Sequence, residues 1–413
     1  MESYFGMAAR TFLAVALVAW AWCRPLLGAS FAAGDYRFTA GSSALCIPFD
    51  PTSRQISLQA RVNGHDKVWL TLDSGSEGSV LDSKLASALG LKAVGRQRSL
   101  GAGGEQEGST VRGVDVELQG FELLDQAMDA LSLEALSAQA GRRMDGIIGH
   151  PIFERCVVQI DYTRHCLSLF DTSRFEYAGR GAVIPIELID SHPYVTASVV
   201  LPGGRSITGR FVIDTGGSSS LIFSSEVIER EGIQAVMGKT LSVQGHGVGG
   251  GTELRLGRVD RLDLGGFSLV RPIAMLKLTG AGRVSAPGTL GNIGAGVLSR
   301  FTVIFDYARR RMILEPGPDL AEAFESDMSG LSLVTAPPEF RTVRVARVMD
   351  DSPGVDAGVR AGDVIEAVDG TPADEIGVPA LRERLRREGQ VIRLGVLRGT
   401  ERILVTLRTR RMI

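Results

Sequence analysis

The chain has 413 residues, which is too long for one ordinary hydrophobic core and suggests about three folded units. Hydrophobic residues make up 44% of it, charged residues 22%, and glycine is abundant at 51 residues. This composition is typical of a globular, turn-rich, mainly β protein and argues against disorder over most of the chain. The formal net charge of −2 provides no general attraction for nucleic acid or for an anionic membrane.

An apolar stretch near the N-terminus has the pattern of an export signal. Residues 11–22 follow Arg10 and lead into small residues. We expect residues 1–33 to be a signal peptide cleaved near Ala29 or Ala33, and the protein to be periplasmic or secreted. Because about 20 apolar residues are needed to cross a bilayer, an uncleaved membrane anchor is the weaker alternative.

The first half of the chain carries a series of local signals. An apolar strand at 68–72 ends in an acid, a hydroxyl residue and a glycine, Asp73-Ser74-Gly75. A glycine-rich segment at 100–104 predicts a hairpin tip, and a stretch of helical composition, 123–140, follows. The series closes with Gly146-Ile147-Ile148-Gly149.

The second half repeats these signals in the same order. A strand at 209–213 ends in Asp214-Thr215-Gly216, a glycine-rich segment spans 245–251, and Asn292-Ile293-Gly294 follows. The two acids are 141 residues apart and the later glycines 145, so the spacing is kept. Self-similarity of this kind predicts two equivalent lobes, with the helical stretch 123–140 present in the first lobe only.

The two acids have the chemistry needed to hydrolyse an amide. Two carboxyl groups about 3 Å apart cannot both ionise easily, so they share one proton. The ionised acid can then take a proton from water while the protonated one supports the carbonyl oxygen, and the roles reverse as the amine leaves. We therefore predict Asp73 and Asp214 as the catalytic pair.

The residues that follow each acid fit the same interpretation. Gly75 and Gly216 lack a Cβ, so the two loops can approach each other and their N–H groups can point at the carboxylates. Ser74 and Thr215 carry hydroxyls that can tie one loop to the other. One such triplet alone is a common turn; two of them, in a duplicated chain, indicate a site at the junction of the lobes.

These motifs resemble those of retropepsin-like aspartic proteases, over about residues 45–317. The resemblance implies two closed β lobes that together form a bilobal acid-protease fold, with a flap from each lobe near 102–107 and 245–251. Gly103, Gly104, His246 and Gly247 are then the expected flap and substrate-contact residues. Both acids lie in one chain, which implies an active monomer.

The sequence departs from this family's usual pattern at three places. Ser74 stands where Thr is commoner, Ser76-Glu77 follows the first triplet in place of two small residues, and Gly217 stands where Ala or Ser is usual. A third carboxylate facing the pair would raise the proton affinity of both acids, so we expect Glu77 to point to solvent.

A separate module follows the repeats. Acidic residues, Ser, Gly and Pro collect between Asp319 and Pro338, which predicts a linker. The run from Ser352 to Ile365 and its flanking strands and helix resemble a PDZ domain of the kind attached to bacterial exported proteases, over about 333–413. The resemblance implies an α+β domain that binds a peptide as an added strand beside 342–348, against the helix at 378–387.

The peptide-binding residues that this resemblance implies are Phe340, Arg341, Thr342 and Val343. A small β domain without a ligand is the alternative for this module. The complete division is 1–33 signal peptide, 34–188 first protease lobe, 189–320 second protease lobe, 321–332 linker and 333–413 PDZ domain.

Neither a metal nor a cofactor is expected. The histidines, His65, His150, His165, His192 and His246, lack the spacing of a zinc site. Gly245, Gly247 and Gly250 match a dinucleotide-type glycine pattern, but no helix or βαβ unit surrounds them.

After signal removal three cysteines remain, Cys46, Cys156 and Cys166, which permits at most one disulfide. Cys156 and Cys166 are expected out of register on a hairpin that turns near 161–164, so we do not pair them. Export makes the compartment oxidising, but the sequence does not require a bridge.

Two functions from different classes remain. The first is an aspartic endopeptidase whose C-terminal module recruits or aligns a protein substrate. The second is a catalytically inactive exported protein that binds peptides through that module. The presence of an acid in both halves favours the first.

Overall fold

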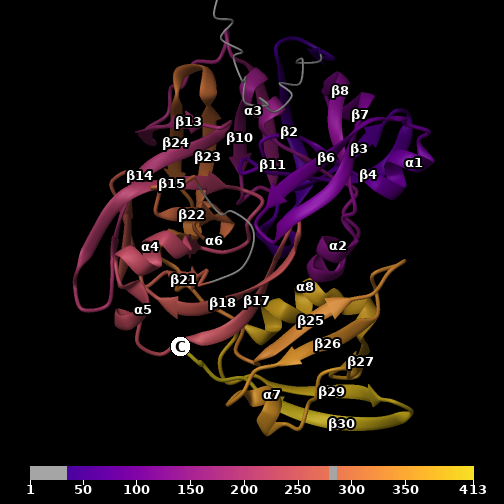
Figure 1. Ribbon diagram of the computed structural model, residues 1–413, viewed down its shortest axis with the longest axis vertical. Helices are drawn as coiled ribbons and strands as arrows, with labels where there is room; N and C mark the ends of the chain where they lie inside the picture. Colours follow the sequence, from indigo (N-terminus) through magenta and orange to yellow (C-terminus); the bar gives the residue numbers. More distant parts are fainter. Residues whose placement is uncertain (1–34, 279–285) are drawn as a thin grey trace, which may run out of the picture. The chain divides into compact units, whose positions relative to one another are not determined.

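The computed structural model describes residues 35–278 and 286–413, and Figure 1 shows their arrangement. The expected signal, 1–33, lies outside these residues. Among the helices of the described ranges, none is both long and apolar enough to span a bilayer.

Strands from both halves of the chain form one antiparallel sheet, which we call the shared sheet. Its order is β12-β24-β23-β10-β11-β2. The strands are β2 (Ser43–Asp50), β10 (Cys156–Asp161), β11 (Cys166–Asp171), β12 (Ala182–Pro185), β23 (Phe301–Asp306) and β24 (Arg311–Pro316). The hairpins β10–β11 and β23–β24 are equivalent in the two repeats, and they meet where β10 pairs with β23. This pairing joins the halves through backbone hydrogen bonds.

The first lobe is a sheet that continues from β2 through β3. Its strands are β1 (Tyr36–Phe38), β3 (Ser57–Val62), β4 (His65–Leu72), β5 (Val80–Asp82), β6 (Ala93–Gly101), β7 (Gly104–Leu118), β8 (Phe121–Leu131) and β9 (Gly146–Ile148). Its helices are η1 (Thr52–Arg54), α1 (Ser83–Ala88), α2 (Glu134–Ala140) and α3 (His150–Arg155). The short strand β9 runs parallel to β4 and antiparallel to β5, so it lies between them.

The second lobe repeats this plan. Its strands are β13 (Glu187–Ile189), β14 (His192–Val200), β15 (Ser206–Asp214), β16 (Leu221–Phe223), β17 (Leu241–Gly247), β18 (Gly250–Arg258), β19 (Arg261–Leu264), β20 (Phe267–Val270), β21 (Ile273–Leu276) and β22 (Gly291–Gly294). Its helices are α4 (Ser225–Arg230), α5 (Ile233–Val236), α6 (Ala295–Leu298), η2 (Tyr307–Arg309) and η3 (Pro318–Ala321). Here β22 lies between β15, to which it is parallel, and β16. The duplication predicted from the sequence is therefore present in the topology.

The C-terminal domain has its own sheet and its own core. Its strands are β25 (Leu331–Thr335), β26 (Val343–Val348), β27 (Val364–Val368), β28 (Thr371–Pro372), β29 (Val391–Arg398) and β30 (Glu401–Arg408), and its helices are α7 (Pro353–Asp356) and α8 (Ala373–Leu385). Burial alternates along β26, and its inward residues pack with α8. A half-buried strand and a helix with an apolar face produce this α+β unit.

Three sequence expectations differ from the structure. Residues 123–140 form a helix only at α2; most of the rest continues β8, because pairing with β7 and β5 overrides the helical composition. β12, placed in the first lobe from the sequence, pairs with β24 of the second repeat. β25 begins at Leu331, inside the expected linker, because its side chains belong to the C-terminal core.

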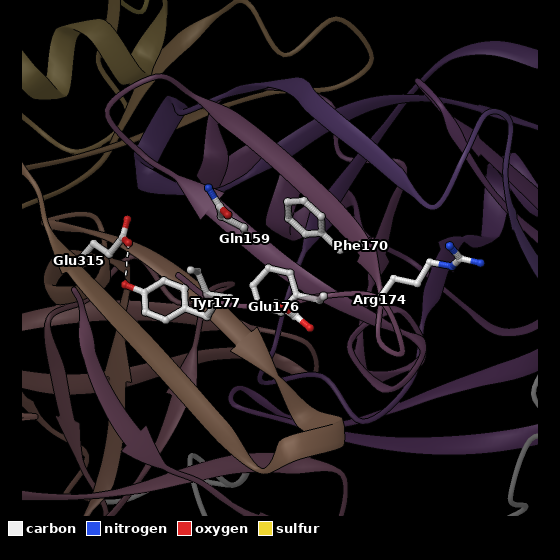
Figure 2. A pocket seen from close by; sticks show the side chains of 8 residues that line it. Gln159, Phe170, Arg174, Glu176, Tyr177 and Glu315 are labelled. Atoms are coloured by element: carbon white, nitrogen blue, oxygen red, sulfur yellow. Dashed lines mark hydrogen bonds between the residues drawn. The ribbon is translucent and has the colours of Figure 1, made fainter. Parts of the chain in front are cut away.

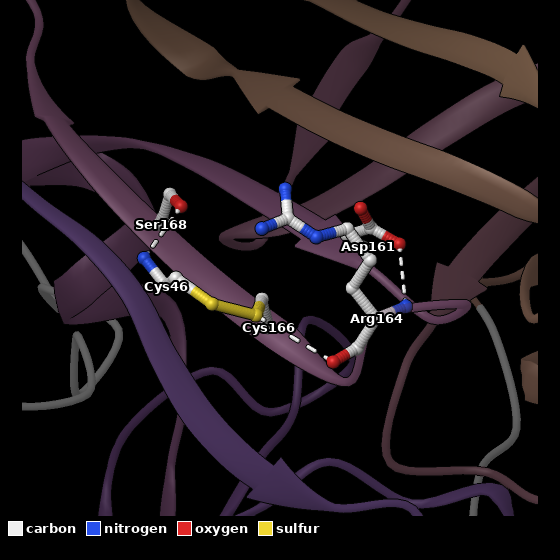
Figure 3. The surroundings of a disulfide bond; sticks show 5 residues. All are labelled: Cys46, Asp161, Arg164, Cys166 and Ser168. Atoms are coloured by element: carbon white, nitrogen blue, oxygen red, sulfur yellow. Dashed lines mark hydrogen bonds between the residues drawn. A yellow bond between two sulfur atoms is a disulfide. The ribbon is translucent and has the colours of Figure 1, made fainter.

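A disulfide joins Cys46 of β2 to Cys166 of β11 within the shared sheet, and Figure 3 shows its surroundings. Cys156 is buried and has a free thiol. In the β10–β11 hairpin Cys156 is opposite Asp171 and Cys166 is opposite Asp161, so these two cysteines are out of register as predicted. The bridge to Cys46 was not predictable, because the neighbour of β11 on its other side is set by long-range pairing.

Candidate active site

The two acids occupy equivalent places in the two lobes. Asp73 follows β4, and its N–H donates to the carbonyl of Ile148 in β9. Asp214 ends β15 and is opposite Gly294 of β22. The residues just before them, Leu72 and Ile213, are fully buried, so each acid loop is anchored in a lobe core.

Reciprocal hydrogen bonds join the two acid loops. The N–H of Ser74 donates to Thr215 Oγ1 at 2.9 Å, and the N–H of Thr215 donates to Ser74 Oγ at 3.1 Å. Each hydroxyl also donates to a carbonyl of the opposite lobe, Ser74 to Ile213 O at 2.8 Å and Thr215 to Leu72 O at 3.0 Å. The four bonds are fully buried and hold the loops in one relative position.

Glycine is required where the loops meet. A Cβ on Gly75 would lie 2.9 Å from Cγ of Asp214, and one on Gly216 would lie 2.3 Å from Cγ of Asp73. Each glycine therefore packs directly against the acid of the other lobe. The close approach brings the carboxyl groups of Asp73 and Asp214 within hydrogen-bonding reach of each other.

The two carboxyl groups of the pair accept hydrogen bonds from different donors. Burial by the surrounding protein and the neighbouring Asp214 raise the pKa of Asp73 well above the usual range of a carboxyl group, although the N–H of Gly75 donates to Asp73 Oδ1 at 2.8 Å. Asp214 accepts from the N–H of Gly217 at Oδ1, at 2.8 Å, and from the side-chain amide of Asn292 at Oδ2. A carboxyl group that holds its proton beside a second carboxyl group is suited to acid–base hydrolysis.

Two glycine-rich hairpins meet tip to tip. The tips are residues 102–103 between β6 and β7, and 248–249 between β17 and β18. The N–H of Gly103 donates to the carbonyl of Val248 at 3.0 Å, and the N–H of Gly249 donates to Gln106 Oε1 at 3.2 Å. Val248 also packs on the apolar group that contains Ile147 of β9. One tip therefore lies beside the strand that supports the first acid loop.

The expected hairpin residues lie at this contact. A Cβ on Gly103 would be 2.1 Å from the carbonyl oxygen of Gly250, and one on Gly247 would be 2.8 Å from Cβ of Ala102. The carbonyl oxygen of Gly104 lies where a Cβ on Gly249 would fall. His246 is exposed on β17, opposite Gly251.

The chain is similar to several known proteins. The family model described as aspartyl protease matches residues 58–152 and again 195–292, and the model described as PDZ domain matches 344–398. The chain carries two aspartyl protease repeats and a PDZ domain. A search of the curated proteins found no match. Among solved structures, the aspartic proteinase from Irpex lacteus is similar, with 14% identity and a TM-score of 0.45, over 68% of this chain and 99% of that chain.

In the PDZ domain the expected peptide-binding strand is wrong. β26 pairs with β25 on one side and with β27 on the other, so Val343 already faces both Thr335 and Ile365. Phe340, Arg341 and Thr342 lie in the connection from β25 to β26. The strands at the two ends of the sheet are β25 and β30, and Arg382 of α8 contacts β25, so β25 is the edge that fits a peptide beside α8.

The edge strand β25 has contacts with other parts of the chain. Arg382 of α8 donates to the carbonyl of Leu333 at 2.6 Å, and burial lowers the pKa of this guanidinium to about 10. Thr335 Oγ1 donates to the carbonyl of Ala138 in α2 at 3.2 Å. A peptide that binds here competes with groups of the protein itself.

Sequence reasoning missed two residues beside the protease site. Gln55 donates its side-chain amide to the carbonyl of Gly216 at 2.9 Å and so supports the second acid loop from the first lobe. Asn292 donates to Asp214. The sequence did contain a signal for Asn292. The second half has Gly291-Asn292-Ile293-Gly294 where the first half has Gly146-Ile147-Ile148-Gly149, so a polar amide stands in place of Ile147.

Other expected features lie away from the pair. Glu77 is exposed, as expected. The described ranges contain no group of three or more His, Cys, Asp or Glu side chains that could hold a metal ion. Figure 2 shows a hollow on the shared sheet in which the hydroxyl of Tyr177 donates to Glu315 at 2.7 Å and accepts from the N–H of Gly181. The hydroxyl of Tyr177 is therefore hydrogen-bonded both as a donor and as an acceptor.

Proposed function

We propose that this chain is an aspartic endopeptidase that hydrolyses peptide bonds of protein substrates with water activated between Asp73 and Asp214. The observation that carries the proposal is the buried set of reciprocal hydrogen bonds between Ser74 and Thr215. This network fixes two carboxyl groups from different lobes against each other, and a binding protein would have no need for it.

The geometry supports the following sequence of steps. One carboxyl keeps its proton because burial and the second carboxyl raise the pKa of Asp73. The ionised partner removes a proton from water as the water attacks the peptide carbonyl, and the protonated acid donates to the carbonyl oxygen. Collapse of the tetrahedral intermediate returns a proton to the departing amine. The glycine-rich hairpins would close over an extended peptide and exclude water.

The PDZ domain extends the proposal to substrate selection. We assign it the binding of a peptide or of a C-terminal segment, added as a strand to the edge of β25 beside α8.

The location we propose for the protein is the periplasm or the cell exterior, either free or tethered through the N-terminal segment. The apolar stretch at 11–22 and the Cys46–Cys166 bridge, which suits an oxidising compartment, both support it. Because each chain holds both acids, a monomer is sufficient.

The test is hydrolysis of an unfolded protein by the purified chain between pH 4 and 8, beside Asp73→Asn and Asp214→Asn. Each variant is expected to lose at least about a thousandfold in rate, because one carboxyl cannot serve as both acid and base. Asp66→Asn, which changes an exposed acid outside the site, is the matched control and keeps the wild-type rate. If both active-site variants and the wild type leave equal fragments, the aspartic endopeptidase hypothesis is wrong.

A second measurement tests the expected monomer. The rate per molecule should not depend on protein concentration, since no acid comes from another chain. A rate per molecule that rises with concentration would contradict this.

A further inference from the structure

The two acid loops have equivalent backbones but unequal support from the strand next to them. In the first lobe Leu72 of β4 is opposite Ile148 of β9, and in the second Ile213 of β15 is opposite Ile293 of β22. One position earlier on the inner strand, the first lobe has Ile147 and the second has Asn292. These two residues are therefore equivalent by register, and one is apolar while the other is a hydrogen-bond donor.

Asn292 is aimed at the reacting carboxyl of its own lobe. Its Nδ2 donates to Asp214 Oδ2, and the residue is only 4% exposed. A carboxylate can only accept hydrogen bonds, so an amide donor facing Oδ2 stabilises the form in which that oxygen carries no proton. Together with the N–H of Gly217 at Oδ1, this gives both oxygens of Asp214 a donor.

The carbonyl oxygen of the same side-chain amide indicates that Asn292 is not required for the fold. Its Oδ1 is buried and has no hydrogen-bond partner among residues 35–278 and 286–413. A structural asparagine is normally satisfied at both ends, and a buried unpartnered polar atom calls for another explanation. Ile147 shows that an apolar side chain fits at the equivalent position of the same fold.

We propose that Asn292 is a positioning residue that assigns unequal roles to the two acids, so that Asp214 is the ionised base and Asp73 is the protonated acid before substrate binds. The proposal rests on the proposed function and deepens it. Two buried phenols also interact with the pair, Tyr162 with Asp214 and Tyr307 with Asp73. Burial raises the pKa of both phenols, so both are neutral. Asp73 accepts from the backbone N–H groups of Gly75 and Gly216, whereas Asp214 accepts from the N–H of Gly217 and from the side-chain amide of Asn292.

The experiment follows the titration of the two carboxyl groups directly. Protein labelled with 13C at the aspartate Cγ is titrated by NMR, and Asp73→Asn and Asp214→Asn assign the two signals. In the wild type the carboxyl with the lower apparent pKa is expected to be Asp214. In Asn292→Ile that pKa is expected to rise by about one unit, because the charged form loses a donor. The acidic limb of the pH profile of kcat/KM should move by the same amount, with KM little changed.

The exchange variant Ile147→Asn/Asn292→Ile sharpens the test, because it moves the donor to the first lobe and should transfer the lower apparent pKa to Asp73. Ile147→Val is the apolar control and should leave both titrations in place. The proposal is overturned if Asp73 titrates first in the wild type, or if Asn292→Ile shifts neither titration. Asn292→Leu serves if the isoleucine variant does not fold. The NMR readout does not need turnover, so the absence of hydrolysis would count against the proposed function alone.

Discussion

The first and second acid loops have the same backbone and different surroundings. Ser74 and Thr215 make the same pair of hydrogen bonds with their roles exchanged, so the lobes hold each other symmetrically. Around the carboxyl groups this symmetry is lost, since Asp214 receives the Asn292 amide and the equivalent residue near Asp73 is Ile147. The duplication thus preserved the hydrogen bonds that position the two acids. In our proposal, the side chains that differ between the lobes determine which acid carries the shared proton.

Substitution of Gly75 and Gly216 tests how closely the two acid loops must approach each other. We expect these substitutions to have the largest effect on kcat/KM. Gly216→Ala should lower kcat/KM by about a thousandfold, because the new Cβ must displace Asp73, and displacement by about 1 Å can cost a hundredfold or more. Gly75→Ala should lose less, since its Cβ would lie farther from Asp214. Gly78→Ala, where the Cβ has open space, should keep the wild-type value. A greater loss in Gly75→Ala would contradict the geometry.

Removing either hydroxyl tests the symmetric part of the comparison. Ser74→Ala and Thr215→Val should each lower the free energy of unfolding by about 2–4 kcal/mol, because each leaves a buried N–H and a buried carbonyl without a partner. Urea unfolding measures this, with Ser87→Ala, which removes an exposed hydroxyl, as the control. The double variant should lower the free energy of unfolding by less than the sum of the decreases in the two single variants. Strictly additive costs would show that the hydroxyls do not act as one network.

The hairpin contact can be tested in the same way. Gly103→Ala should raise KM about tenfold, because its Cβ would meet the backbone of Gly250 and keep the tips apart. Gly95→Ala, on the same hairpin with open space around its Cβ, is the matched control and should behave as the wild type. Equal KM values for the two variants would show that the tips need not touch during turnover.

The smallest expected effect concerns stability and its dependence on pH. The folded-state pKa of Asp73 is raised, so its contribution to stability is fully present below the unfolded value near 3.8 and is lost as pH rises through the folded-state pKa. Asp73→Asn has no carboxyl group to ionise at this position, so it does not lose this stability as the pH rises. Its urea midpoint should therefore exceed that of the wild type at pH 7 and match it at pH 3. A midpoint at pH 7 below that of the wild type would mean that Asp73 is not held in its protonated form.

Local sequence was sufficient for features that depend on short-range chemistry. The duplicated triplets located Asp73 and Asp214, and glycine-rich segments located both hairpin tips, because turns and close approaches restrict residue type directly. The same reasoning overestimated the helix at 123–140. There, pairing of β8 with two neighbouring strands outweighs a composition that favours helix.

Sequence by itself determined that the chain is duplicated, that each half supplies one acid, and that a third module follows. Tertiary structure alone decided that β26 of the PDZ domain is paired on both sides while β25 ends the sheet, that Cys46 pairs with Cys166, and that Asn292 reaches Asp214. The physical reason is the same in all three cases. Each depends on which strands become neighbours across long sequence separations, and a strand's own residues record its burial pattern but not its partners.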